Sequence, residues 1–358
     1  MNTREESSGS FRPWGFFMFC QFVRDGRDAD RLSRVVLLLT VVVLACMAGG
    51  PLWGASDPSE TMKRRQQGIL TGMPFMANVA PRTFVDDLGR KIYLAKVPKR
   101  IVSLAPSITE MLFAIGAGES VVGVTEFCNY PPEALEKPKV GYAQPNLEAI
   151  LALQPELIVA PKSFLRVDLL DRLEQLKIPT FLFDPKSVEN ILAHIQLLGR
   201  MVGQVPESIK VTERIRKKVT AISEQLSGRP RPVLLFVLNT DPLITVGPGS
   251  YIHQLIELAG ARNAAEQASM PYPRLNIEEV LRQNPEFLLF PTGQFEGIPQ
   301  AEQDQWRRWT SLEAVKRDQF VQVDSDMLNR PGPRVIDALE ALVAILHPDV
   351  VQPARQEE

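Results

Sequence analysis

The chain has 358 residues, of which 45% are hydrophobic, and this size suits two domains or one large bilobed domain. Its formal net charge of −2 argues against a nucleic-acid binder, because phosphate contacts favour a basic surface. The sequence contains no G-x-S-x-G, P-loop, G-x-G-x-x-G or CxxC motif, which removes the commonest signatures of hydrolases, nucleotide-binding enzymes and dithiol redox enzymes.

Residues 1–50 are predicted to be an N-terminal extension with a signal or anchor segment. Several arginines precede a short apolar run, VVLLLTVVVLACMA at residues 35–48, which is shorter than the ~20 residues of a membrane span. This pattern indicates a secretory signal, with an uncleaved anchor helix as the alternative. The run contains VLAC, which resembles a lipobox and makes Cys46 a candidate for lipidation. We therefore expect a periplasmic or cell-envelope protein.

Residues 51–81 are mostly polar, carry Gly and Pro, and predict a flexible tether. An α/β pattern follows in residues 82–203, which we assign to an N-terminal lobe. It opens with a predicted hairpin, FVDDLGRKIYL, and one of its helices starts with a capping-box spacing from Ser107 to Glu110. Strands are predicted at 100–104, 121–124, 157–160 and 180–183. Strands separated by helices predict a parallel sheet.

After Pro206 the sequence runs to Leu226 without a further Gly or Pro, and it predicts one helix ~30 Å long. We assign residues 204–228 to this interlobe helix and residues 229–358 to a C-terminal α/β lobe. Strands of the second lobe are predicted at 233–238, 287–290 and 320–323, and a final helix at 334–346. The predicted fold class is α/β, with two Rossmann-like lobes that contain parallel sheets and are joined by one long helix.

One helix–strand unit occurs twice in the sequence. NLEAILALQPELIVAP starts at Asn146 and NIEEVLRQNPEFLLFP starts at Asn276, with Asn, Glu, Leu and Pro at identical offsets. Asn caps a helix and Pro ends one in any α/β protein, so these residues need no function. Glu148 and Glu278 each fall in the first helical turn. There the macrodipole favours a carboxylate, so a purely stabilising role is one interpretation.

Five stretches together resemble the periplasmic substrate-binding proteins of ABC importers with a rigid helical backbone, and lean towards their cobalamin-binding branch. They are RIVSLAPSITEMLFAIGAGESVVGVT, NYPPEALEKPKVG, NLEAILALQPELIVA, MPYPRLNIEEVLRQNPEFLL and RPGPRVIDALEAL. The family takes up cobalamin, ferric siderophores, haem and some metal ions. The resemblance implies a ligand cleft between the lobes and a connector that resists hinge bending.

The resemblance also implies a role for the repeated carboxylates. In the cobalamin binders one surface acid on each lobe docks onto arginines of the permease dimer, and the motif matches place these acids at Glu148 and Glu278. A two-fold symmetric permease presents the same basic pocket twice, so a bilobed carrier needs one acid per lobe. Such charged pairs orient the complex more than they add affinity.

The expected cleft lies at the carboxyl ends of the strands. Aromatic side chains there suit a flat corrin ring, and the resemblance puts Phe127, Tyr142 and Tyr272 at ring-contacting positions. The alternative is that about half of the aromatics pack the cores, which we favour for Tyr130. Further polar candidates are Asn129, Gln144 and Lys162. The predicted ligand-binding residues are Phe127, Tyr130, Tyr142, Phe164, Tyr251, Tyr272 and Arg330.

Three side-chain types bear on the ligand. Arg330 would suit an anionic ferric siderophore, but it could equally form a structural ion pair. The three histidines are scattered and predict no metal site, although His253 lies near a cleft loop and could approach a bound cobalt. Cys128 would serve a thiol-dependent enzyme only with a histidine within hydrogen-bond reach.

We therefore predict a monomeric, non-enzymatic solute-binding component of an ABC import system. It has no cofactor besides its ligand, and its partners are a permease dimer and a small molecule. We expect contact with the membrane through an N-terminal anchor or lipid, and none with nucleic acid. The expected ligand is a corrinoid; the alternatives are a ferric siderophore or haem, and, more remotely, a thiol-dependent enzyme.

Overall fold

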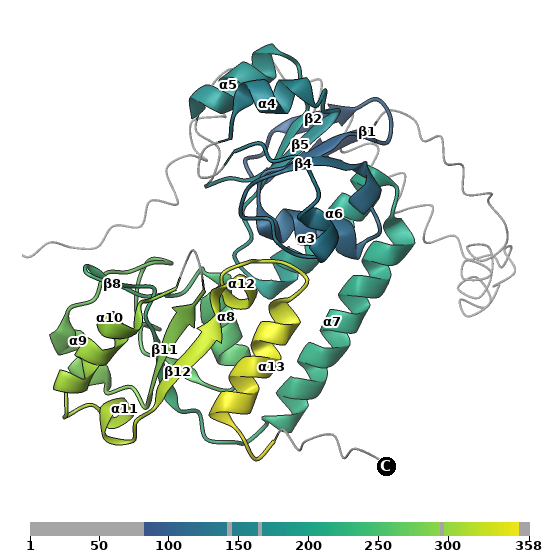
Figure 1. Cartoon of the computed structure of the whole chain (residues 1–358). Helices are drawn as coiled ribbons and strands as arrows, with labels where there is room; N and C mark the ends of the chain where they lie inside the picture. The colour runs from purple at the N-terminus through teal and green to yellow at the C-terminus, as the bar shows by residue number, and fades with distance from the viewer. Residues whose placement is uncertain (1–81, 142–144, 164–166, 294–296, 351–358) are drawn as a thin grey trace, which may run out of the picture. The chain divides into compact units, whose positions relative to one another are not determined.

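The computed structural model describes residues 82–141, 145–163, 167–293 and 297–350, which all lie within Phe75–Glu358. Its described part contains two separate four-stranded sheets, each parallel and each covered by helices, so the predicted α/β class is confirmed (Figure 1). The predictions for residues 1–81, including Cys46, and for Tyr142, Gln144 and Phe164 lie outside the described residues.

The first lobe opens with the predicted antiparallel hairpin, β1 (Arg82–Val85) and β2 (Lys91–Leu94). Its four predicted strands are all present and pair in the order β4–β3–β5–β6. Side chains of β3, β5 and β6 are almost entirely buried, as expected for strands covered on both faces. The strand bounds are β3 Ile101–Ser103, β4 Val121–Val124, β5 Leu157–Pro161 and β6 Thr180–Phe183.

The second sheet has the order β10–β7–β11–β12. If the short antiparallel pair β8–β9 is set aside, both sheets share one spatial order: second, first, third and fourth strand along the chain. β7 is shorter than predicted, and β10 was not predicted because two residues show no periodicity. The bounds are β7 Val233–Phe236, β8 Asn239–Thr240, β9 Leu243–Ile244, β10 Arg262–Asn263, β11 Phe287–Thr292 and β12 Phe320–Asp324.

The repeated sequence unit occupies the same place in each sheet. In the first lobe α4 (Leu147–Ala152) leads into β5, and in the second lobe α9 (Ile277–Gln283) leads into β11. Both strands are third in their sheets. The matched units therefore belong to two sheets rather than one continuous sheet, as the two-lobe prediction requires.

The predicted interlobe helix is α7 (Val205–Gln225), whose 21 residues span ~31 Å. It packs against α3 and α6 of the first lobe and against α8 and α13 of the second. Of the described helices, none has both the length and the apolar character of a membrane span. The other helices are α3 Pro106–Ala114, α5 Val167–Gln175, α6 Val188–Val202, α8 Tyr251–Leu258, α10 Gln300–Asp304, α11 Glu313–Lys316, α12 Ser325–Leu328 and α13 Val335–Leu346.

Two features of the helices differ from the sequence analysis. α6 was not predicted, although it has clear end signals: the Ser187 hydroxyl accepts from the Asn190 N–H, and Gly203 follows with a φ of 76°. The capping box from Ser107 to Glu110 is wrong. α3 starts at Pro106, before Ser107, its N-cap makes no side-chain hydrogen bond, and Glu110 is buried against arginines of the other lobe.

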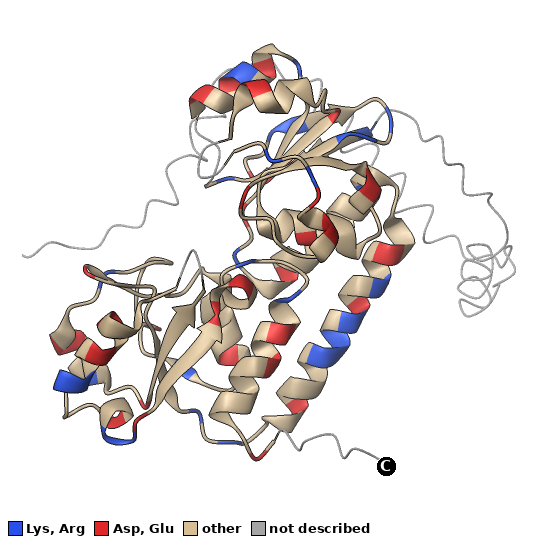
Figure 2. Ribbon diagram, in the orientation of Figure 1, with Lys and Arg blue, Asp and Glu red and all other residues tan. Residues whose placement is uncertain are grey.

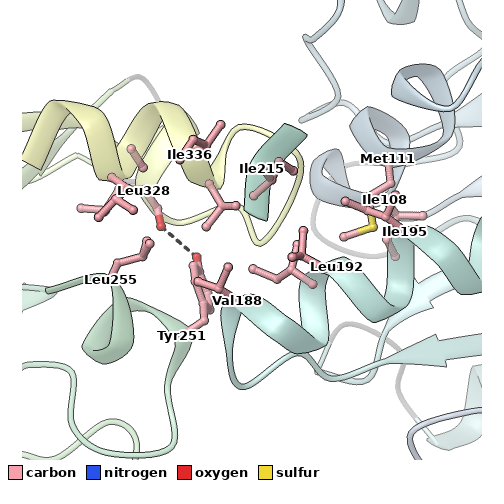
Figure 3. Packing of buried hydrophobic residues seen from close by; sticks show 14 of the residues in the cluster. Ile108, Met111, Val188, Leu192, Ile195, Ile215, Tyr251, Leu255, Leu328 and Ile336 are labelled. Atoms are coloured by element: carbon pink, nitrogen blue, oxygen red, sulfur yellow. Dashed lines mark hydrogen bonds between the residues drawn. The ribbon is translucent and has the colours of Figure 1, made fainter. Parts of the chain in front are cut away.

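The main hydrophobic core continues from one lobe into the other. Figure 3 shows side chains of α3, α6 and α7 in line with those of α8, α12 and α13, and the Tyr251 hydroxyl donates to the Leu328 carbonyl at 2.9 Å. Two smaller clusters cover the other face of each sheet. Because interiors are densely packed, a core shared by both lobes resists hinge bending between them.

Candidate functional site

A cleft of about 400 Å³ lies between the lobes, at the carboxyl ends of the strands of the first sheet. This is where ligands sit in open α/β sheets, and the volume falls in the usual range for small-molecule sites. The first lobe contributes Leu104, Ala105, Pro106, Ser107, Thr125, Phe127, Pro161, Ser163, Phe183, Asp184 and Pro185. The second lobe contributes Tyr251, Tyr272, Asp326, Asn329, Arg330 and Pro331.

The structure brings four of the predicted ligand-binding residues together: Phe127, Tyr251, Tyr272 and Arg330. Tyr130 does not line the cleft. It is 45% exposed, so it is not packed in a core either, and the Arg334 guanidinium lies 4.4 Å from the centre of its ring. Tyr130 instead lines a neighbouring depression beside α7 and α13.

The two cleft tyrosines differ in what their hydroxyl groups can do. Tyr251 is 5% exposed and donates to the Leu328 carbonyl, so it forms part of the cleft floor as a core residue. Tyr272 is 52% exposed and reaches the cleft from the loop before α9. Desolvation, and then the negative charge of Asp184, raise the pKa of the Tyr272 phenol. Tyr272 therefore stays a neutral hydrogen-bonding group.

Arg330 lines the cleft, yet its guanidinium is occupied by protein groups. Nη1 donates to Asn129 Oδ1 at 2.6 Å and lies 3.4 Å from Glu110 Oε1, while Nη2 lies 2.5 Å from Asp326 Oδ1. Asn129 donates in turn to Asp326 Oδ2 at 2.8 Å. Because Glu110 and Asn129 belong to the first lobe, these contacts favour the ion-pair interpretation of Arg330.

Asp184 is a cleft residue that the sequence analysis missed, although it directly follows β6, at the carboxyl end where cleft residues were expected. Its carboxylate lies 3.3 Å from Lys162 Nζ and 3.6 Å from Lys186 Nζ. Its backbone N–H donates to Asp87 Oδ2 at 2.5 Å. The turn of the β1–β2 hairpin therefore holds this wall of the cleft.

His194 contacts the same wall of the cleft through Asp87 and Phe183. Its Nε2 lies 3.0 Å from Asp87 Oδ2, and its ring is 4.2 Å from that of Phe183, a cleft residue. Desolvation lowers the pKa of His194, and the Asp87 carboxylate opposes this only in part. His194 Nδ1 is buried without a hydrogen-bond partner in the described structure, so the neutral ring is favoured.

The described residues contain no group of three or more His, Cys, Asp or Glu side chains that could hold a metal ion. His253 is not a cleft-lining residue, and its ring nitrogens lie near Asn263 and Glu257. The Cys128 sulfur is buried and lies 3.3 Å from the hydroxyl groups of Thr109 and Thr125. These contacts do not give Cys128 the histidine that a thiol nucleophile needs.

Glu148 and Glu278 occupy equivalent positions in α4 and α9. In each helix an asparagine caps the first turn: Asn146 accepts from the Ala149 N–H at 3.0 Å, and Asn276 from the Glu279 N–H at 2.8 Å. Both glutamates are exposed, and neither forms an ion pair with any residue that the structure describes. Their role in docking stays a prediction, and the geometry leaves both carboxylates free for it.

A family model described as periplasmic binding protein matches residues 101–327. The vitamin B12-binding protein of Vibrio cholerae is 31% identical over 250 residues, which are 69% of this chain and 89% of that protein. A crystal structure of the V. cholerae protein matches with a TM-score of 0.62 and 30% identity, over 72% of this chain and 99% of that one.

Two other relatives show the range of the similarity. An uncharacterised ABC transporter substrate-binding lipoprotein of Bacillus subtilis is 27% identical over 323 residues, 87% of this chain and 96% of that protein. The periplasmic haem-binding protein of Roseiflexus, in its apo form, matches with a TM-score of 0.62 and 26% identity, over 71% of this chain and 99% of that one.

Proposed function

The chain belongs to the periplasmic binding protein family, and from this premise we propose that it captures a corrinoid of the vitamin B12 type in its interlobe cleft and delivers it to an ABC importer. Members of this family are substrate-binding components of transporters, not enzymes, and they work with permease and ATPase components. The family membership is established, whereas the identity of the ligand and of the residues that bind it is our proposal.

The charge of the cleft is the observation that carries this proposal. The charged side chains lining the described part of the cleft are Asp184, Asp326 and Arg330, and Arg330 is already paired with Asp326 and Glu110. Asp184 is in turn paired with Lys162 and Lys186, so an anionic ligand would find no free arginine among these lining residues. A corrinoid, whose flat ring carries neutral amide groups, would use the exposed aromatic surface and hydrogen bonds instead.

A ferric siderophore or haem is the alternative ligand, favoured by the similarity to a haem-binding protein. A tyrosine that ligates iron does so as phenolate, and the raised pKa of Tyr272 disfavours that form. No histidine lines the cleft in the residues that the structure describes. Both facts support the corrinoid over an iron complex.

A fluorescence titration tests the ligand directly. Cyanocobalamin should quench tyrosine and tryptophan emission with micromolar or tighter affinity, while ferric siderophores and haemin should not compete for the site. Tight binding of an iron complex, without binding of cyanocobalamin, would replace the corrinoid by the alternative.

Delivery is proposed to use Glu148 and Glu278 as one docking acid per lobe on the permease dimer, with the carrier acting as a monomer. We also propose export to the cell envelope and lipidation at Cys46, supported by the lipoprotein among the relatives. The mass of the mature N-terminus in wild type and in a Cys46→Ser variant tests this. A mature chain that keeps residues before Cys46 contradicts it.

A further inference from the structure

Phe127, one of the predicted ligand-binding residues, lies in a loop at the edge of the first sheet. The loop follows β4, which is the outermost strand in the order β4–β3–β5–β6, so no further strand of the described sheet supports it on that side. Phe127 falls in a turn of this loop, and its half-buried side chain lines the cleft. The direction of the ring therefore depends on the contacts that hold the loop.

The first lobe holds this loop through the residues on either side of Phe127. The Glu126 N–H donates to the Gly141 carbonyl at 3.1 Å, and the Cys128 N–H donates to the Thr125 carbonyl at 3.1 Å. The buried Cys128 sulfur also lies 3.3 Å from the Thr125 hydroxyl. These contacts fix where the loop lies on its own lobe.

The second lobe reaches the same loop through Arg330. Nη1 of Arg330 donates to Asn129 Oδ1 at 2.6 Å, and Nη2 makes a longer contact of 3.4 Å with the Phe127 carbonyl. Asn129 donates to Asp326 Oδ2 at 2.8 Å, and Asp326 Oδ1 accepts from Arg330 Nη2 at 2.5 Å. Figure 2 shows this junction as basic residues between α12 and α13 next to acidic residues on α12 and α3. One guanidinium group thus contacts two residues of the loop from the other lobe.

The guanidinium of Arg330 is itself held in place. Arg330 is only 9% exposed, and Nη1 also lies 3.4 Å from Glu110 Oε1. A planar guanidinium directs its N–H groups in a fixed fork, so it meets Asn129 and Asp326 in one geometry, whereas a lysine ammonium is a compact point charge. Because its outer nitrogens already meet protein acceptors, Arg330 is poorly placed to bind the ligand itself.

We propose that Arg330 is a positioning residue: it holds the Phe127 loop so that the ring is fixed in the cleft before the ligand arrives, and it raises ligand affinity without contacting the ligand. A side chain that is ordered in advance loses less entropy on binding. This inference rests on the proposed function, because it takes Phe127 to contact the ligand. It adds that the second lobe sets the geometry of a contact made by the first.

Tyr272 offers an internal comparison, because other groups hold its loop. The residues on either side of Tyr272 each accept a backbone hydrogen bond, at 2.8 and 3.1 Å, from the loop before α8. These bonds lie within the second lobe and do not involve Arg330. A change at Arg330 should therefore displace Phe127 and leave Tyr272 in place.

A double-mutant cycle on the full chain tests the proposal, with cyanocobalamin as the probe. Arg330→Lys keeps a positive charge beside the buried carboxylates and should weaken binding about tenfold. In a Phe127→Ala background the same change should weaken binding less than about twofold, because no ring is left to position. In a Tyr272→Ala background it should again weaken binding about tenfold. Equal losses in the two backgrounds would indicate a general loosening or a direct ligand contact of Arg330, and would overturn the proposal.

Arg334→Lys is the matched control. Arg334 shares Glu110 with Arg330, but its described hydrogen bonds go to Glu110 and to the Asp326 carbonyl instead of the Phe127 loop. The control should therefore change the affinity for cyanocobalamin less than about twofold. A loss as large as that of Arg330→Lys would assign the effect to the ion-pair network as a whole and would overturn the proposal.

A fluorine label at Phe127 gives a readout that needs no ligand. Fluorophenylalanine is incorporated at this position alone, and its resonance is followed by fluorine NMR in the ligand-free chain. Arg330→Lys should shift or broaden the resonance, and Arg334→Lys should leave it unchanged. If the wild type fails to bind cyanocobalamin, the corrinoid proposal fails while this measurement still decides the positioning role. An unchanged resonance in Arg330→Lys would overturn that role.

Discussion

Glu110 of the first lobe and Arg334 of the second are joined by two hydrogen bonds of 2.7 and 2.9 Å. Glu110 is only 3% exposed, and Arg330 approaches the same carboxylate from the cleft side. The two lobes are thus tied directly below the ligand cleft, in addition to their shared core and α7. Ligand binding is therefore expected to cause little movement between them.

Glu110→Ala is expected to destabilise the protein strongly, because it leaves two buried or half-buried arginines without their shared carboxylate. Removing one partner of a buried ion pair costs about 3 kcal/mol or more. Denaturant unfolding measures this cost. Lys96→Ala serves as the control, since Lys96 forms an exposed pair with Glu156 and should cost less than about 1 kcal/mol. Equal effects of the two changes would contradict a structural role for the interlobe pair.

The two cleft tyrosines should respond in opposite ways to substitution. Tyr272→Ala removes an exposed ring from the cleft and should weaken corrinoid binding by about 2 kcal/mol, with little change in stability. Tyr251→Phe removes the hydrogen bond to the Leu328 carbonyl and should lower the free energy of unfolding by about 1 kcal/mol, with little change in affinity. Calorimetric titration and denaturant unfolding of both variants separate the two roles. If Tyr251→Phe weakened ligand binding and Tyr272→Ala lowered stability instead, the roles assigned to the two tyrosines would be wrong.

The sequence alone predicts the framework well where local patterns decide it. The buried strands at 157–160 and 287–290 read as short apolar runs, and a long stretch free of Gly and Pro identifies α7. The rule that ligands face the carboxyl ends of strands also puts Phe127 and Arg330 at the cleft. These features depend on periodicity and chain order, which a single sequence shows directly.

Features that depend on tertiary partners could not be predicted in the same way. Glu110 has the spacing of a capping residue, and only the fold brings Arg334 to it from 224 positions along the chain. Arg330 could bind an anion or form an ion pair until Asn129 and Asp326 are seen beside it. Asp184 could have been predicted as a cleft residue, because it directly follows a strand at its carboxyl end. Its contact with Asp87 of the hairpin could not be predicted, because no local sequence pattern links the two residues.

Stability is expected to fall below about pH 6.5 through His194. Desolvation lowers the pKa of this histidine in the folded state below the ordinary value of 6.5. The unfolded chain therefore binds the proton more readily, and His194 stabilises the fold above pH 6.5 and loses this effect as the pH falls. Asp87 and Phe183 contact the ring, and Asp184 also lies near enough to favour the proton, so both carboxylates limit the loss.

Urea unfolding of the wild type and of His194→Gln between pH 8 and pH 5 measures this contribution. Glutamine cannot be protonated, so the variant should show a flatter dependence of the unfolding free energy on pH. His253→Gln is the control, because His253 makes no contact with this wall of the cleft, and it should retain the dependence of the wild type. A His194 variant that parallels the wild type would assign the loss to other groups.

The paired surface acids give the sharpest test of delivery. Glu148→Ala/Glu278→Ala should leave corrinoid affinity unchanged, because neither residue lines the cleft, and should weaken binding to the permease at low ionic strength. Each single variant should lose part of the effect, since each lobe is expected to supply one acid. Glu207→Ala/Glu224→Ala on α7 removes two exposed acids from another surface and should bind the permease like the wild type. The affinity of each soluble carrier variant for surface-bound permease is measured over a series of salt concentrations. Loss of ligand affinity in the Glu148→Ala/Glu278→Ala variant would contradict the assignment of these acids to the docking surface.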